Sequence, residues 1–321
     1  MADFQNTRPL IAPDAVRQVA VIGSGTIGAS WAALFLAHGL EVTVYDPNPA
    51  AEATTSALIG QAWQGLVGLG ITAQTTPRLW RFTTDLRDAA SNADFVQESG
   101  PERADVKRTL YAELEASLRN HVIVASSTSG LVMSDLQHGL RHPGRFAVGH
   151  PFNPPHLIPL VEIVAGSQTD LAVPAWLDAF YRRVGKAPIR LNKEVPGHLA
   201  NRLQAALWRE AVHAVASGLA SVEDVDTAIA QGPGLRWAVM GPHMIFHLAG
   251  GDGGLQHFID HIGPAMEDWW RDLGAPHLDP NVSATLVAGV TDEARGRARA
   301  DLVQQRDAAL IALIRQLQPK L

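Results

Sequence analysis

A histidine and a glutamate lie in two neighbouring strand-like segments. Residues of these two types can together remove a proton from a substrate. His150 directly follows the apolar segment 145–149, and Glu162 lies in the apolar segment 160–164. The turn sequence Pro151-Phe152-Asn153-Pro154 separates them, so the second strand can return beside the first. A carboxylate beside an imidazole fixes the tautomer of the ring and stabilises its charged form. We therefore predict that His150 is a general base and that Glu162 supports it.

A serine-rich turn provides a second candidate group. The turn, Ser126-Ser127-Thr128-Ser129-Gly130, follows the strand-like segment 121–125. Ligands of an open α/β sheet bind outside the carboxyl ends of its strands, which is where Ser129 and His150 would both lie. We predict that Ser129 belongs to the site, although a serine here is also typical of a turn or a helix N-cap.

Residues 19–46 have the pattern of a strand, a glycine turn, a helix and a second strand. The turn Gly23-Ser24-Gly25-Thr26-Ile27-Gly28 follows the apolar run 19–22 and opens a helical pattern over 26–38. Gly23 permits the tight turn, and Gly25 lets the backbone approach a pyrophosphate at the helix N-terminus. Gly28 lets the helix pack closely on the sheet. This context predicts a dinucleotide site. The cofactor-binding positions expected in the turn are Gly23, Gly25, Thr26, Ile27 and Gly28.

Asp46, at the end of the second strand, predicts NAD rather than NADP. Its carboxylate can accept hydrogen bonds from the adenosine ribose. A 2′-phosphate would face the same carboxylate, and the next residues, Pro47-Asn48-Pro49, offer no arginine to offset it. The alternative is a βαβ unit that binds no ligand, but an acid at this position favours the cofactor.

The strands that position these residues occupy the first part of the chain. Helical patterns separate the earlier ones, which predicts a mostly parallel, doubly wound α/β sheet. The last strands follow one another closely, so we expect antiparallel pairing at one edge. Beyond the first two strands, the expected segments are 93–97, 121–125, 145–149, 160–164 and 188–191.

Strand-like segments give way to helical patterns near Asn192, where we place a domain boundary. Residues 1–192 are expected to form the NAD-binding domain, and residues 193–321 an all-helical domain for substrate binding and dimerisation. The expected helices of the second domain are 198–217, 222–230, 235–247, 255–261 and 292–317.

The composition is typical of a well-packed globular protein without a nucleic-acid or membrane partner. The 321 residues exceed the usual size of one core, which predicts two domains. The formal net charge is −6, with scattered acids. The absence of cysteine excludes disulfides and thiolate metal sites, and we expect no metal. With no apolar stretch of membrane-spanning length and no signal-peptide pattern, the cytoplasm is the expected location.

Five motifs in one order make the sequence resemble the L-3-hydroxyacyl-CoA dehydrogenase superfamily over nearly its whole length. The resemblance implies a Rossmann domain, a helical domain that forms a homodimer, and NAD-dependent oxidation of a secondary alcohol. The motifs are the glycine turn with Asp46, Ser127-Thr128-Ser129, His150-Pro151-Phe152-Asn153-Pro154, Val161-Glu162, and Pro196-Gly197 followed by Asn201-Arg202-Leu203.

Matched motif by motif, the resemblance implies a role for each residue of the site. His150 is the implied catalytic base, held by Glu162. Ser129 and Asn201 are implied to bind the reacting oxygen, and Asn153 to support the site beside the cofactor. In chemical terms, His150 takes the hydroxyl proton while NAD takes the hydride, and the two donors stabilise the oxygen as negative charge develops.

The resemblance also implies that Glu98 and Arg103 lie near the nicotinamide ribose. These two residues have a structural interpretation as well, because they could form a solvated pair near a helix start. Asn201 could simply begin a helix, and Glu162, in an apolar strand, could pair with an arginine. These alternatives stay open at the level of the sequence.

The scarcity of lysine argues against a CoA thioester as the substrate. Residues 47–106 contain no lysine, and the whole chain contains four. Recognition of the CoA phosphates needs cations or helix ends. Arg78 and Arg81, with the segment 51–70, could still dock CoA, so an L-3-hydroxyacyl-CoA dehydrogenase acting on a short-chain thioester remains an alternative.

The helical half resembles the L-carnitine dehydrogenase branch and, more distantly, L-gulonate dehydrogenase and lambda-crystallin. The segments that carry this resemblance are 207–211, 234–242 and 248–254, together with 126–131. It implies a free, small L-3-hydroxy acid as substrate. Arg236 is the candidate partner of a carboxylate, and Trp237 and Phe246 could face a trimethylammonium group. Each could instead belong to an ion pair, the core or a dimer interface.

L-Carnitine is the first substrate to test, with L-gulonate as an alternative. The sequence has Asn201 where carnitine enzymes often have Asp, and Phe246-His247 where they have Tyr. A function of a different class, a non-catalytic NAD-binding structural protein, is also open. The combination of Ser129, His150 and Glu162 with Asn201 favours an enzyme, because a structural protein has no need of that set.

Overall fold

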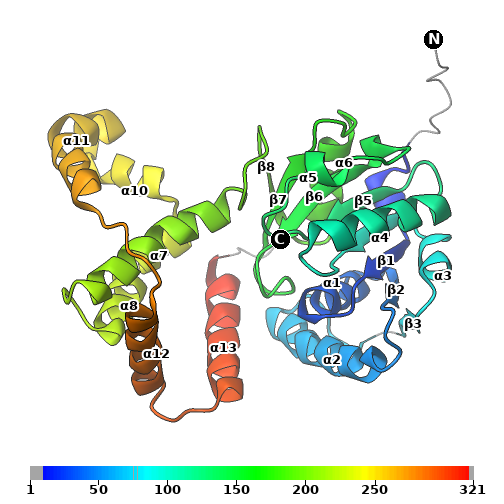
Figure 1. Ribbon diagram of the computed structural model, residues 1–321, viewed down its shortest axis with the longest axis horizontal. Helices are drawn as coiled ribbons and strands as arrows, with labels where there is room; N and C mark the ends of the chain where they lie inside the picture. The colour runs from blue at the N-terminus through cyan, green and yellow to red at the C-terminus, as the bar shows by residue number, and fades with distance from the viewer. Residues whose placement is uncertain (1–9, 75, 78, 318–321) are drawn as a thin grey trace. The chain divides into compact units, whose positions relative to one another are not determined.

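The computed structural model describes residues 10–74, 76–77 and 79–317 (Figure 1). The chain divides into two compact units. The first comprises Met1–Asn201 together with Arg306–Leu321, and the second comprises Arg202–Gln305. The end of the chain therefore belongs to the same unit as its beginning.

The first unit contains an eight-stranded sheet in the order β3-β2-β1-β4-β5-β6-β7-β8. Neighbouring strands are parallel except at β6 and β7, which pair antiparallel. This arrangement confirms the predicted mostly parallel α/β sheet with an antiparallel pair near one edge. The strands are β1 (Gln18–Ile22), β2 (Glu41–Tyr45), β3 (Arg81–Thr83), β4 (Phe95–Glu98), β5 (Ile123–Ser126), β6 (Phe146–Pro151), β7 (Leu160–Ala165) and β8 (Ala187–Arg190).

Helices cover both faces of the sheet (Figure 1). One face carries α1 (Thr26–Ala37), α2 (Ala51–Leu69) and α6 (Val173–Arg183). The other face carries α3 (Leu86–Ala90), α4 (Ala104–Ser117) and α5 (Met133–Leu136). Short 3-10 turns, η1 (Pro13–Ala15) and η2 (Pro143–Arg145), precede β1 and β6.

Aromatic side chains fill the core beneath α1 and α6. The ring centroids of Phe95 and Phe180 lie 4.5 Å apart, and those of Trp31 and Phe35 lie 5.3 Å apart. All four side chains are fully buried. Each such burial contributes about 1.5–3 kcal/mol, so this cluster rigidly joins the first helix to the sheet.

The second unit is helical, and all of its residues are described. Its residues form no strand, as the sequence predicted. The helices, including the first and last, which begin or end in the other unit, are α7 (Ala200–Ala216), α8 (Val222–Gln231), α9 (Pro233–Val239), α10 (Pro242–Ala249), α11 (Gly254–Asp272), α12 (Pro280–Ala294) and α13 (Arg299–Leu317). A 3-10 turn, η3 (Gly251–Gly253), precedes α11.

Two expected helices are each divided in the structure. The expected helix 235–247 consists of α9 and α10, because Met240 has extended backbone and Pro242 begins a new helix. The expected helix 292–317 breaks after α12, where Arg295 and Gly296 have φ values of 51° and 70°. In each case, one helical pattern in the sequence spans two helices and the turn between them.

Among the described residues, no helix combines the length and the apolar character required to cross a membrane.

Candidate active site

The loops that follow four parallel strands meet at one edge of the sheet. Gly23 follows β1, Ser99 follows β4 and Ser127 follows β5, while His150 lies near the end of β6. The backbone N–H of Ser99 donates to Ile22 O at 2.7 Å, and the N–H of Ser127 donates to Glu98 O at 2.7 Å. Open α/β sheets bind ligands at this edge.

The structure brings His150 and Glu162 together. They are directly opposed in the antiparallel register of β6 and β7. The Nδ1 atom of His150 lies 2.8 Å from Oε2 of Glu162. Glu162 is fully buried, and His150 is 5% exposed. Because a carboxylate accepts, the proton of the neutral ring resides on Nδ1, which leaves the Nε2 lone pair free to take a proton.

The second carboxylate oxygen of Glu162 holds the start of α7. Its Oε1 accepts hydrogen bonds from the backbone N–H groups of Leu199 and Ala200, both at 2.9 Å. Burial alone would raise the pKa of Glu162, but the hydrogen bonds from His150, Ala200 and Leu199 outweigh it and leave the pKa below its ordinary value. Glu162 is therefore a carboxylate that serves the ring and the helix together.

Ser129 and Asn201 also come together. The amide Nδ2 of Asn201 donates to the backbone oxygen of Ser129 at 3.0 Å. The hydroxyl of Ser129 donates to Oε1 of Glu102 at 3.1 Å, so in this arrangement it offers lone pairs outward. The amide of Asn201 retains a second hydrogen, because a primary amide carries two.

Glu102 organises the serine-rich turn, although it is not among the residues predicted from the sequence. Its Oε1 accepts from the Thr128 hydroxyl at 2.7 Å and from the N–H groups of Ser129 and Gly130 at 2.8 and 3.0 Å. Burial opposes its ionisation, yet these donors and the nearby charge of Lys107 hold its pKa below the ordinary value. Its position four residues past the end of β4 does not distinguish it in the sequence, because its partners lie 26 to 28 residues further along the chain.

Glu98 is fully buried and has all of its partners inside the protein. Its Oε1 accepts from the Gly100 N–H and from Lys107 Nζ, both at 2.6 Å. Its Oε2 accepts from the hydroxyls of Tyr111 and Ser126, both at 2.7 Å. Glu98 thus braces the ends of β4 and β5.

Arg103 is exposed and donates to Asp105 from its Nη2 at 2.5 Å. The predicted position of Glu98 and Arg103 beside a nicotinamide ribose remains a prediction.

His198 is a second imidazole beside the candidate base, and the sequence did not indicate it. Its ring centroid lies 5.2 Å from that of His150. Nε2 lies 3.0 Å from the backbone oxygen of Thr128, so it carries the proton. Burial, with the nearby charge of His150, lowers the pKa of His198. Burial and the neighbouring His150 thus disfavour a charge on the second ring.

The glycine turn has the geometry that the fingerprint requires. Gly23 has a φ of 103°, and a Cβ there would lie 2.5 Å from Ser99 O. A Cβ on Gly28 would lie 1.8 Å from Gly23 O, whereas one on Gly25 would meet no atom within 4 Å. No side chain caps the first turn of α1, so the N–H groups of Thr26 and Ile27 can receive a phosphate.

Asp46 borders a pocket of about 510 Å³ next to this turn. Asp105 and Glu113 also line the pocket, and its lining includes no lysine or arginine. Oδ2 of Asp46 accepts from the Ser24 hydroxyl at 2.6 Å, which holds the carboxylate beside the turn. A 2′-phosphate beside Asp46 would meet a carboxylate and no lysine or arginine of the lining, in agreement with NAD.

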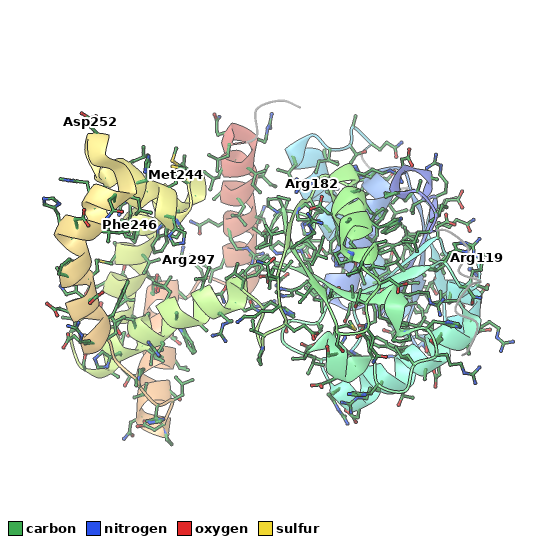
Figure 2. All side chains as sticks on the ribbon, turned by 90° about the horizontal axis from the view of Figure 1, so that it is seen from above. Arg119, Arg182, Met244, Phe246, Asp252 and Arg297 are labelled. Carbon is green, nitrogen blue, oxygen red and sulfur yellow. The ribbon has the colours of Figure 1, made fainter. Side chains whose placement is uncertain are left out.

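The remaining predicted residues are Asn153 in the first unit and three residues in the second unit. Asn153 is exposed on the β6–β7 loop. Arg236 and Trp237 lie on α9, and Phe246 lies on α10, where Figure 2 labels it. The ring of Phe246 stacks on Phe258 at 4.5 Å between centroids. Their predicted contact with substrate remains a prediction.

The basic residues of the alternative CoA site are described only in part. Arg81 pairs with Asp88, and Arg78 lies outside the described residues. Within the described part of the chain, no group of three or more potential ligands is arranged to hold a metal ion.

Comparison with known proteins identifies relatives over most of the chain. Residues 18–195 match the family model of the 3-hydroxyacyl-CoA dehydrogenase NAD binding domain, and residues 197–277 match the C-terminal domain of the same family. An L-carnitine dehydrogenase of Streptomyces coelicolor is 49% identical over 306 residues, which is 95% of this chain and 96% of the relative. An L-carnitine dehydrogenase of Oceanobacillus iheyensis is 41% identical over 299 residues, which is 93% of this chain and 97% of the relative.

A solved structure is similar over almost the same length. It is that of 5-formyl-3-hydroxy-2-methylpyridine 4-carboxylic acid 5-dehydrogenase, an NAD+-dependent dismutase. Its TM-score is 0.82 at 31% sequence identity, and the match covers 95% of this chain and 100% of that chain. These matches confirm the predicted family, fold and NAD cofactor. The chain belongs to the 3-hydroxyacyl-CoA dehydrogenase family and is an NAD-dependent oxidoreductase that acts on a CH–OH group.

Proposed function

We propose that the protein oxidises the secondary alcohol of an L-3-hydroxy acid to the 3-keto acid, with His150 as the general base. The observation that carries this proposal is the buried pair of His150 Nδ1 and Glu162 Oε2, 2.8 Å apart, at the ligand-binding edge of the sheet. NAD, when bound, accepts the hydride from the carbinol carbon. His150 takes the hydroxyl proton on Nε2, and Glu162 stabilises the resulting imidazolium. General-base help of this kind contributes about 10²–10⁴ in rate.

We assign Ser129 and Asn201 to the oxygen of the substrate. The second amide hydrogen of Asn201 is free of the contact with Ser129 O and can donate to an oxygen that gains negative charge. The Ser129 hydroxyl, which donates to Glu102, can accept the substrate hydroxyl before the proton moves to His150. The His198 ring would border the site beside the base.

For the cofactor, the glycine turn and Asp46 are the proposed anchors. Thr26 and Ile27 would bind the pyrophosphate through their N–H groups, and Asp46 would bind the adenosine ribose. We place Glu98 and Arg103, with Asn153, on the nicotinamide side. Because Glu98 is fully buried, its influence there would act through Gly100, whose N–H it binds.

L-Carnitine is the proposed substrate, because relatives that cover 93–95% of this chain at 41–49% identity are named L-carnitine dehydrogenases. Arg236 would bind the carboxylate. Trp237 and Phe246 offer the aromatic faces that a trimethylammonium group prefers.

The test of this function is NAD reduction with a substrate panel. The panel contains L-carnitine, L-gulonate, L-3-hydroxybutyrate and 3-hydroxybutyryl-CoA. We expect turnover with L-carnitine at the highest kcat/KM. Turnover with L-gulonate alone would replace L-carnitine by another L-3-hydroxy acid and leave the proposed reaction unchanged. Turnover only with the CoA thioester would overturn the free-acid proposal.

We also propose that the helical unit forms a homodimer. Large apolar side chains stand exposed on α9 to α11, including Trp269 and Trp270, which are 58% and 63% exposed. Apolar surface of this extent is typical of a protein–protein interface. Sedimentation should give twice the chain mass of 34.4 kDa. A monomer at all concentrations would contradict the proposal.

The two parts of the chain then have separate roles. Residues 1–192 would bind NAD, and residues 193–321 would supply substrate and dimer contacts. We also propose a cytoplasmic location, where NAD would be available as the oxidant.

A further inference from the structure

A buried lysine holds the loop between the strands of the proposed base and its carboxylate. Lys186, which immediately precedes β8, is 7% exposed. Its Nζ donates to the backbone oxygen of Pro155 at 2.6 Å and also to that of Ile158. The same ammonium lies 5.2 Å from the ring centroid of Trp31. The amino group of Lys186 thus contacts two carbonyls of one loop and an aromatic ring of α1.

The absence of a counter-charge makes this lysine unusual. Within the described residues, Lys186 forms no ion pair with a carboxylate. Burial lowers the pKa of Lys186 to about 7, which reflects the cost of removing a charge from water. An apolar side chain could fill the volume without that cost, so the contacts with the loop are what the lysine adds.

The first helix binds the same loop at a second point. The hydroxyl of Ser30 accepts the N–H of His156 at 2.9 Å and lies 2.8 Å from Nδ1 of the same residue. Burial lowers the pKa of His156 to about 4, so its ring is neutral, and one hydrogen bond joins Nδ1 to the Ser30 hydroxyl. Ser30 is 3% exposed, so water does not compete for these bonds.

These contacts join the part of the protein proposed to bind the cofactor to the part that carries the proposed base. Ser30 and Trp31 are consecutive on α1, and they follow Gly28 of the glycine turn. The loop 152–159 joins β6 to β7, which carry His150 and Glu162. The contacts therefore connect the helix that would bind the cofactor with the hairpin that presents the base.

We propose that Lys186 is a positioning residue for hydride transfer, and that with Ser30, Trp31 and His156 it fixes the distance between α1 and the His150–Glu162 hairpin. The inference rests on the proposed function, because that function gives the distance its meaning. A misplacement of about 1 Å between reacting groups can cost about 10²-fold in rate. Loosening the loop should therefore lower kcat more than it weakens cofactor binding.

The principal test compares Lys186→Met with Arg145→Met. Arg145 is a matched control, since it is a cation 4% exposed at the opposite end of β6, where it donates to Arg119 O at 2.8 Å. For Lys186→Met we expect kcat to fall by about 10- to 100-fold, with KM for NAD within about twofold and a larger isotope effect for substrate deuterated at the carbinol carbon. Arg145→Met should lower Tm and leave kcat unchanged. Equal losses of kcat in both variants would overturn the proposal.

Ser30→Ala provides a second route if Lys186→Met does not fold. It removes the bonds to His156 and leaves the lysine in place, so kcat should fall by about 3- to 10-fold. Because both side chains act on one loop, the double variant should lose less than the product of the two single losses. An unchanged kcat in Ser30→Ala, or strictly multiplicative losses, would contradict a shared device.

Hydrogen exchange with NADH bound separates this inference from the proposed function. The amides of His156, Leu157 and Ile158 are bonded to Ser30 Oγ and Pro154 O. They should exchange faster in Lys186→Met than in wild type or Arg145→Met. Unchanged exchange would overturn the positioning role even if the enzyme is active. If the wild type reduces NAD with no member of the panel, the proposed function fails, and the exchange result still decides whether the lysine holds the loop.

Discussion

The carboxylate of Glu162 joins His150 to the backbone at the start of α7. One oxygen lies 2.8 Å from His150 Nδ1, and the other accepts the N–H groups of Leu199 and Ala200 at 2.9 Å. Asn201 is the next residue of that helix. A single buried acid therefore sets the tautomer of the proposed base and the position of the proposed oxygen-binding amide.

Glu162→Gln should lower kcat by at least about 10²-fold with little change in KM for NAD. The amide can still accept from α7, but its NH2 group would face Nδ1 and favour the wrong tautomer of His150. Steady-state kinetics measure the effect. Glu194→Gln is the matched control, because Glu194 binds the Ser134 N–H at 2.9 Å outside the proposed site. A fully active Glu162→Gln enzyme would show that the pair is only structural.

The stability of the fold should depend on Glu162 in acid. Its pKa in the folded protein lies below the ordinary value of 4.5, because the bonds from His150, Ala200 and Leu199 outweigh burial. Its stabilisation is therefore complete above about pH 4.5 and is lost as the pH falls through the folded pKa. Urea unfolding between about pH 6 and pH 3 should show wild type and Glu162→Gln converging in free energy of unfolding. A constant difference across that range would contradict the assignment.

Two glycines of the turn should respond differently to alanine. A Cβ on Gly28 would lie 1.8 Å from Gly23 O, so Gly28→Ala should lower Tm and abolish NAD binding together. A Cβ on Gly25 would meet no atom within 4 Å, so Gly25→Ala should fold with an unchanged Tm. It should still weaken NAD binding, because the methyl group would occupy the path of the pyrophosphate. Thermal unfolding and NADH titration distinguish the two, and equal affinity in Gly25→Ala would place the cofactor elsewhere.

Asp46→Ala should weaken NAD binding by about 10-fold, which corresponds to the loss of a charged hydrogen bond. The kcat should remain unchanged, because Asp46 lines the pocket proposed for the adenosine ribose, and His150 is not part of that lining. The preference for NAD over NADP should narrow, although Asp105 and Glu113 remain in the lining. Asp178→Ala, which removes an acid paired with Arg182 on α6, serves as the control. A wild-type preference for NADP would exclude the role given to Asp46.

The sequence predicted the features that depend on local patterns. The run 19–22, the glycine turn and Asp46 lie close together in the chain, and the turn between His150 and Glu162 is short enough to fix their register. The three-residue strand β3 escaped notice, because Arg81–Thr83 is too short to show alternation.

The features that the sequence could not reveal depend on distant partners. Glu102 accepts hydrogen bonds from residues 128–130. Lys186 contacts the loop 155–158 and Trp31. The sequence also does not show that residues 306–317 belong to the first unit rather than to the second. Tertiary packing decides such contacts, and a one-dimensional pattern does not contain them.

The most direct test of the central claim is NADH formation by His150→Gln beside wild type, with NAD affinity measured in both. Glutamine cannot accept and hold the hydroxyl proton, so turnover should fall by about 10²- to 10⁴-fold while NAD binding stays intact. A His150→Gln enzyme that binds NAD and retains full turnover would contradict the account.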